Sequence, residues 1–288
     1  MIPAFLITFR EALEAALIIA IMIAYLKKVG KIELNRYVWL GTGGAILASI
    51  VIGLIVLVTY GELKGTAEKL FEGIAAILAT VVLTYMIFWM AKNAKKIKGE
   101  LEEKIDVSIT TGQILGISAL AFIAVFREGV ETVLFITAIA LADPLGTVIG
   151  VIVGAAVVLG LAILLLKGSV RLPIKAFFKY TSILLVIFAA GLFGYGIHEL
   201  IEVGEATGVN FGVLGKEAFN INPLKNSDGS YPLMHEKGAV GSILKALVGY
   251  DGNPEWLRVI GYLAYWIVVG LYLIKTYSPT LLARKVEG

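Results

Sequence analysis

The 288-residue sequence contains no cysteine. This absence excludes disulfides, thiolate metal sites, cysteine-ligated iron–sulfur clusters and a cysteine nucleophile. Histidine is nearly as scarce, with only His198 and His235. Haem ligation needs two imidazoles held at opposing positions inside a helix bundle, and neither histidine is placed deep enough for that. No Walker A loop is present, so ATP drive within this chain is not expected.

Charge is also scarce, because only 16% of the residues are charged and 58% are hydrophobic. A soluble domain is roughly 25% charged and 45–50% apolar. The mean hydropathy is +0.88. No basic stripe with interleaved aromatics occurs, so we expect no nucleic-acid partner. The composition therefore predicts a protein whose solvent is a lipid membrane.

Seven apolar runs are each long enough to cross about 30 Å of hydrocarbon as a helix. The first run carries Arg10, Glu11 and Glu14 and has no basic segment before it, so we interpret it as a retained helix and not a signal peptide. The predicted fold is therefore all-α and polytopic, with seven transmembrane helices. The runs are 2–26, 37–60, 70–91, 112–141, 145–167, 180–201 and 257–276.

The distribution of basic residues predicts how the chain is oriented. Three short loops are rich in lysine and arginine: 27–36, 92–111 and 168–179. They alternate with basic-poor connections at 61–69 and Asp143-Pro144. By the positive-inside rule the N-terminus lies outside, and the C-terminus with Arg284 and Lys285 lies in the cytoplasm. The predicted location is the cell membrane.

This orientation makes the chain a single membrane domain with an internal inverted repeat. Residues 1–91 form the first three-helix repeat and 112–201 the second, followed by an outer loop at 202–256 and a C-terminal helix at 257–276. The two repeats also share a sequence motif, because Phe-Arg-Glu-x-x-Glu occurs once in each. The first copy contains Arg10, Glu11 and Glu14 (motif 1), and the second contains Arg127, Glu128 and Glu131 (motif 2).

Both motifs lie inside apolar runs, where each charge costs about 2.5–3.5 kcal/mol at the membrane centre. On a helix the two glutamates of a motif share one face, and the arginine is one turn before the second glutamate. Each motif is net −1, so two facing motifs carry surplus negative charge. Such an arrangement suits a hard cation with oxygen ligands. We therefore predict metal ligands at Glu11, Glu14, Glu128 and Glu131, with supporting ion pairs from Arg10 and Arg127.

A closed ion-pair cluster that locks the two helices together without a ligand is the structural alternative. Small residues and neutral hydrogen bonds would serve that purpose without unbalanced charge. Small residues do recur at Gly146, Gly150 and Gly154, a pattern typical of close helix packing or of self-association into a homo-oligomer.

The doubled motif resembles the signature of the oxidase-coupled ferric iron permeases, also called the iron/lead transporter family. Supporting strings include Phe71-Glu72-Gly73, Phe88-Trp89-Met90 and Tyr262-x-x-Tyr265-Trp266. The resemblance implies seven transmembrane helices, iron-binding motif glutamates and a separate ferroxidase or iron-delivery protein. An Asp-Ala-Ser-Glu string found in the last outer loop of some fungal members is absent here.

Further acidic residues mark a candidate entrance near the outer ends of two helices. Glu72 precedes an uncharged stretch of the third run, and a stripe at three- to four-residue spacing ends the sixth. Solvated helix ends would explain these positions equally simply. The entrance residues are Glu72, His198, Glu199 and Glu202.

The leading hypothesis is a permease that moves ferric iron into the cell, with iron as substrate and no cofactor. A divalent-cation transporter for manganese, ferrous iron or lead is the nearest alternative, since all these ions take oxygen ligands. A membrane di-iron carboxylate enzyme is less well supported. Such sites use Glu-x-x-His pairs, and here the third residue after the glutamate is another glutamate. We therefore do not expect an enzyme.

Overall fold

The computed structural model of the chain describes residues 1–93, 96–141, 143–166, 174–226 and 230–277. Within these residues the protein is α-helical, with only an isolated antiparallel bridge between Glu217 and Glu255, so the all-α prediction is confirmed. The basic residues Arg171, Arg284 and Lys285, which contributed to the predicted orientation, lie outside the described residues.

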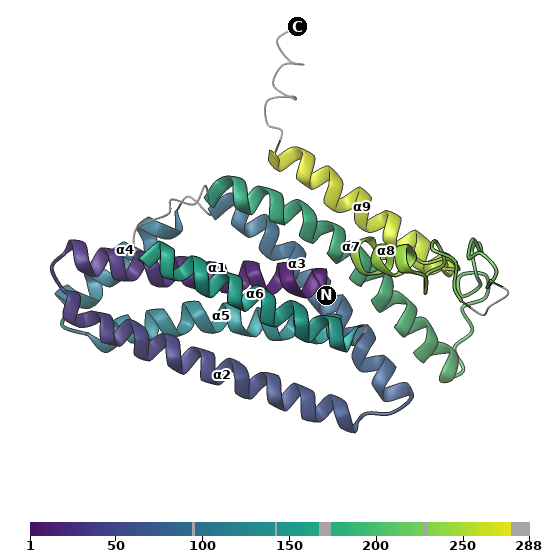
Figure 1. The fold of residues 1–288 in the computed structure, drawn as a ribbon, viewed down its shortest axis with the longest axis horizontal. Helices are drawn as coiled ribbons and strands as arrows, with labels where there is room; N and C mark the ends of the chain where they lie inside the picture. Colours follow the sequence, from purple (N-terminus) through teal and green to yellow (C-terminus); the bar gives the residue numbers. More distant parts are fainter. Residues whose placement is uncertain (94–95, 142, 167–173, 227–229, 278–288) are drawn as a thin grey trace, which may run out of the picture. The chain divides into compact units, whose positions relative to one another are not determined.

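Each of the seven predicted apolar runs forms a long helix (Figure 1). Their lengths follow from long, predominantly apolar stretches of sequence, with Gly- or Pro-containing connections between them. The bounds are α1 Ile2–Lys28, α2 Asn35–Glu62, α3 Thr66–Asn93, α5 Leu115–Ala140, α6 Pro144–Leu166, α7 Ile174–Ala206 and α9 Trp256–Tyr277.

Three further helical segments lie in stretches that the sequence left as loops. A 3-10 turn spans Ile32–Leu34 and α8 spans Ala239–Val248 within the outer loop. Helix α4, Ile97–Thr110, occupies most of the basic connection 92–111. It is helical because Ile105 is buried in a hydrophobic cluster with Leu26 of α1 and Ile117 of α5. The interpretation of 92–111 as a plain loop was therefore wrong.

Five helices of the described residues are long and apolar enough to cross a membrane: α2, α3, α6, α7 and α9. Helices α1 and α5, of 27 and 26 residues, are equally long. Each of them carries the three ionisable residues of its motif within the apolar stretch. The protein is thus a polytopic helical membrane protein, and the sequence features that set α1 and α5 apart are the motifs.

The chain divides into two compact units. The first consists of Met1–Glu62 with Lys92–Thr181 and contains α1, α2, α4, α5 and α6. The second consists of Leu63–Ala91 with Ser182–Gly288 and contains α3, α8, α9 and most of α7.

In the first unit, α6 packs along α1 and α2 packs along α5, each pair with both helices running in the same direction. Both seams are close because glycine stands at the contact. A side chain at Gly150 of α6 would collide with the carbonyl oxygen of Met1, Cβ of Ala4 and the nitrogen of Phe5. A side chain at Gly41 of α2 would collide with the carbonyl oxygen of Ser118, Cβ of Ala121 and the nitrogen of Phe122.

These two sets of contacts are equivalent when motif 1 is aligned with motif 2. The alignment places Ala4 opposite Ala121 and Phe5 opposite Phe122. A second pair of contacts also occupies aligned positions. Stacked rings lie one turn before each motif, with centroids 5.7 Å apart in Phe5–Phe9 and 5.2 Å apart in Phe122–Phe126. The two seams therefore share backbone spacing, side-chain identity and ring geometry.

In the second unit, α3 and α7 pack antiparallel through glycine. A side chain at Gly73 would collide with Leu200, and one at Gly196 would collide with Ile77. Helix α9 is attached through a hydrogen bond between Thr84 and Tyr265 of 2.9 Å.

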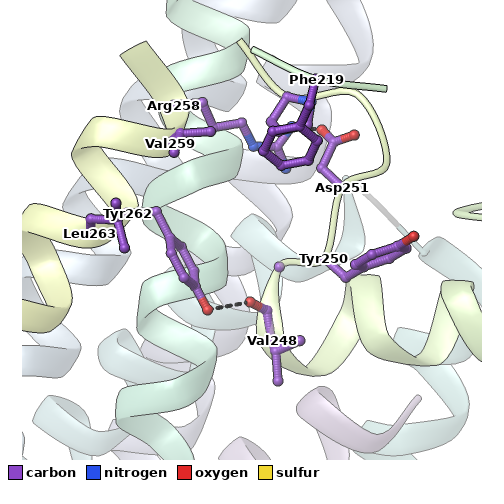
Figure 2. A pocket seen from close by; sticks show the side chains of 10 residues that line it. Phe219, Val248, Tyr250, Asp251, Arg258, Val259, Tyr262 and Leu263 are labelled. Atoms are coloured by element: carbon purple, nitrogen blue, oxygen red, sulfur yellow. Dashed lines mark hydrogen bonds and ion pairs between the residues drawn. The ribbon is translucent and has the colours of Figure 1, made fainter. Parts of the chain in front are cut away.

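A cavity of about 280 Å³ lies at the start of α9 in this second unit (Figure 2). Arg258 and Asp251 line it and form an ion pair, and Phe219 lies beside them. Tyr262 donates a hydrogen bond of 2.9 Å to the carbonyl oxygen of Val248, which fixes the end of α8 against α9.

Candidate metal centre

The motif residues gather in the interior of the first unit, where α1 and α5 contact each other. Glu11, Glu14 and Glu128 are buried, and the side chain of Glu131 is 15% exposed. The small residues of the two seams allow this burial, because α6 and α2 approach the motif helices to backbone distance. The small-residue pattern of α6 therefore serves helix packing, as its sequence indicated.

Motif 1 is tightly paired. The Arg10 guanidinium, with 0% side-chain exposure, lies 2.9 Å from Glu11 Oε1 through Nη1 and 2.7 Å from Glu14 Oε1 through Nη2. This confirms the ion pair expected between residues four apart on a helix. Both carboxylates of motif 1 therefore share one arginine.

Motif 2 has the same two pairs, but the pair between residues four apart is longer. Arg127 Nη2 donates to Glu128 Oε1 at 2.5 Å, whereas its Nε lies 3.7 Å from Glu131 Oε1. The Arg127 side chain is 42% exposed. The pair between residues four apart is thus closed in motif 1 and extended in motif 2.

Three carboxylates converge from the two helices. Glu11 of α1 with Glu128 and Glu131 of α5 each offer an oxygen within 4.8 Å of the others. Cations bound by oxygen have ligands at about 2.0–2.6 Å, so ligands across a site are up to roughly 4–5 Å apart. Oε2 of each of these glutamates is buried and has no hydrogen-bond partner in the described residues. The arrangement can accept a cation without breaking an existing hydrogen bond at these oxygens.

Glu14, the fourth predicted ligand, is not part of this group of three. Its carboxylate is held by Arg10. The structure therefore brings together three of the four predicted ligands.

The predicted entrance residues all lie in the second unit, within a polar network. Tyr195 donates a hydrogen bond of 2.6 Å to Glu72, and Glu202 forms an ion pair with Lys69. Glu199 is buried beside them on α7. Glu72 and Glu202 therefore each have a nearby polar or charged partner within the second unit.

His198 is bound to the start of α9. Its Nδ1 lies 2.7 Å from Glu255, and its Nε2 lies 3.7 Å from Glu202. Burial raises the pKa of Glu255, but the hydrogen bond with His198, a backbone hydrogen bond and the charges of His198 and Arg258 together outweigh burial and hold that pKa below its ordinary value. Glu255 is therefore an ionised anchor for α7.

Comparison with known proteins gives a match across nearly the whole chain. The model of the Iron permease FTR1 family matches residues 1–278. The chain belongs to this family. An uncharacterized protein of Archaeoglobus fulgidus is 45% identical over 90% of both chains. The ferrous iron permease EfeU of Yersinia pestis is 34% identical over 91% of this chain and 89% of its own. No solved structure matches.

Family membership makes this protein a transporter and not an enzyme, with iron transport across a membrane as the family's activity. The ferrous iron permease EfeU of Escherichia coli O6:K15:H31 is a further relative, 33% identical over 91% of both chains. The resemblance inferred from the doubled motif is thereby confirmed.

Sequence reasoning missed one contact in each unit. Ser49 of α2 occupies the space that a side chain at Gly129 of motif 2 would fill. Helix α2 therefore packs directly against the helical turn that carries Glu128 and Glu131. Small residues four apart in α2, at Gly41, Ala45 and Ser49, could have signalled this seam. Tyr195 was also missed, because a lone aromatic in an apolar run carries no signal.

Proposed function

We propose that this chain moves ferric iron into the cell along a path lined by the motif carboxylates, with Glu11, Glu128 and Glu131 holding the ion. The observation that carries the proposal is the convergence of three carboxylates from two helices, each with a buried and unpartnered oxygen. Carboxylate oxygens are hard ligands and suit a hard trivalent ion. Glu14 completes the path.

The balance of charge supports a ligand over a closed ion-pair lock. Four carboxylates share two guanidinium groups, so two negative charges stay uncompensated inside an apolar bundle. A cluster that served packing alone would be disfavoured, because buried charges without partners cost several kcal/mol each. A bound cation would remove this cost.

The packing of the described helices supports seven spans and the inverted repeat. In the proposed scheme, α1 to α3 form one repeat and α5 to α7 the other. In an inverted repeat, a contact between two helices has an equivalent contact between their counterparts in the other repeat. The equivalent seams at Gly41 and Gly150 have this property, and so does the Gly73–Gly196 crossing.

We also propose that the N-terminus lies outside and the C-terminus in the cytoplasm. Single cysteines introduced at Lys28 and Lys98 should react with a membrane-impermeant thiol reagent from one side only. Cysteines at Lys64 and Asn210 should react from the other side. Because the chain has no cysteine of its own, each label reports one position. Labelling of all four from one side would contradict both the topology and the repeat.

Ferrous iron is the second candidate substrate, because the EfeU relatives of Yersinia pestis and Escherichia coli are named ferrous iron permeases. A divalent ion would balance the surplus charge of −2, whereas a trivalent ion would leave the site with a net charge of about +1. A separate ferroxidase or iron-delivery protein, implied by the resemblance, would decide which form reaches the site. Collection of the ion by Glu72 and Glu199 belongs to the same proposal.

The test is uptake into proteoliposomes that contain only this chain. Ferric citrate, ferrous iron with ascorbate, manganous chloride and lead acetate are compared at equal free metal. Saturable uptake of ferric iron above the others supports the proposal, and preference for ferrous iron replaces it with the second candidate. Glu11→Gln and Glu128→Gln should abolish iron uptake, while Glu62→Gln on the exposed end of α2 should not. Normal uptake in the first two variants would refute the site.

A further inference from the structure

The two motifs have the same Arg-Glu-x-x-Glu sequence but differ in the conformation of their side chains. Glu11 and Glu128 correspond to each other in the repeat, and both belong to the group of three ligands. Glu14 and Glu131 also correspond, yet only Glu131 belongs to the group. The site thus contains one matched pair of carboxylates and one member of a second pair.

The arginines account for this asymmetry. Arg10 holds Glu14 at 2.7 Å and keeps it out of the group. Arg127 lies 3.7 Å from Glu131, which leaves that carboxylate free to face Glu11 and Glu128. The exposures agree, since Arg10 is completely buried within its pairs and Arg127 is 42% exposed. One motif is closed on its arginine while the other presents both carboxylates.

An inverted repeat makes the opposite asymmetry available to the same chain, because each half can adopt the conformation now seen in the other. We propose that iron moves by a ligand exchange in which Glu11 and Glu128 stay bound while Glu14 replaces Glu131 as the third ligand. Arg127 then closes on Glu131 as Arg10 releases Glu14. This inference rests on the proposed function and assigns different roles to glutamates of the same motif.

The exchange conserves the interactions that hold the site. In either state one arginine holds both carboxylates of its motif closely, the other arginine holds one closely and one at a longer distance, and three carboxylates face the ion. Two states with the same number of ion pairs differ little in free energy, which is what a carrier that alternates between two forms requires. The exchange also moves the third ligand from α5 to α1, and so shifts the ion between the two helices.

The experiment separates binding from transport in four single variants and one double variant. Iron binding is measured by titration of ferric citrate into purified protein in detergent, and uptake is measured in proteoliposomes. Glu14→Gln and Glu131→Gln each leave one complete three-carboxylate state, so each should bind within about threefold of the unaltered protein, which is less than 1 kcal/mol. Both should lose uptake by at least tenfold. Glu14→Gln/Glu131→Gln should lose binding as well.

Glu11→Gln and Glu128→Gln remove ligands common to both states and should lose binding and uptake together. Equal loss of binding in all four single variants would indicate one four-ligand site and overturn the exchange. Normal uptake by Glu14→Gln or Glu131→Gln would overturn it too. Failure of the unaltered protein to bind iron would instead refute the proposed function. Melting temperatures, with Glu62→Gln as the control, identify any variant that fails to fold.

Discussion

Two buried arginines of this protein have different surroundings. Arg258, at the start of α9, is paired with the single carboxylate of Asp251 beside a cavity (Figure 2). Arg10 faces Glu11 and Glu14 in a cluster to which motif 2 adds more carboxylates than cations. A charge buried for structure is matched one to one, because each unmatched charge destabilises the fold. The motif cluster departs from that rule at the place where a cation would bind.

The largest effect is expected from removing the fully buried guanidinium of the cluster. Arg10→Ala strands two buried carboxylates and should lower the free energy of unfolding by on the order of 3–5 kcal/mol. Arg127→Ala should cost less, because that side chain is 42% exposed. Thermal melting in detergent measures both, with Lys64→Ala as the control. Equal destabilisation by the two alanine variants would contradict the asymmetry of the motifs.

The next largest effect on stability is expected from breaking the one-to-one ion pair between Arg258 and Asp251. Asp251→Asn leaves Arg258 buried without its counter-charge and should cost about 2–3 kcal/mol. Glu128→Gln should leave stability nearly unchanged or raised, because it relieves surplus charge, while uptake is lost. Melting temperature and uptake of both variants are compared. The comparison fails if Glu128→Gln destabilises the protein as much as Asp251→Asn.

The same pair predicts a dependence on pH. Burial raises the pKa of Asp251, but the charge of Arg258 and the hydrogen bond from the backbone nitrogen of Asn253, together with weaker interactions, outweigh burial and hold that pKa below its ordinary value of 3.8. A lowered folded-state pKa means that the stabilisation is present above about pH 4 and is lost as pH falls through the folded-state pKa. Melting temperature between pH 3 and pH 7 should therefore fall at the acid end. In Asp251→Asn this part of the acid dependence should disappear.

A smaller effect is expected from the seams that bury the cluster. Gly129→Ala would collide with Ser49 and should cost roughly 1–3 kcal/mol through overpacking. Ser49→Gly in the same chain should restore both stability and uptake, because it removes the colliding atoms. The matched control is Gly43→Ala, where nothing lies within 4 Å of the added carbon. Absence of rescue would show that Gly129 is required for another reason.

The smallest effect on stability is expected from an exposed ion pair. The Met1 ammonium lies 3.0 Å from Asp143, and the hydrogen bond from that ammonium lowers the pKa of Asp143. Both side chains are more than half exposed, so solvent screens the pair. Asp143→Asn should change the free energy of unfolding by less than about 1 kcal/mol. A larger loss would show that burial does not decide what these pairs contribute.

The sequence predicted the positions of the seven long helices that the structure describes, because apolar runs of membrane length have few other structures available. It did not predict α4, since its buried face needs only a few apolar residues such as Ile105. Among the candidate ligands, Glu11, Glu128 and Glu131 come together as expected. The exclusion of Glu14 from the group could not be foreseen, because Glu14 and Glu131 occupy equivalent positions on their helices. Only their distances to the arginines distinguish them.

The seam between α1 and α6 has a consequence for biosynthesis. Helix α1 leaves the ribosome first, but the glycines that seat it, Gly150 and Gly154, are made more than a hundred residues later. At 5–20 residues per second the delay is on the order of 10 s. During that time the charges of motif 1 lack α6, and for most of it they also lack motif 2. Insertion of this protein should therefore depend on a channel or chaperone that keeps α1 out of lipid until the second half arrives.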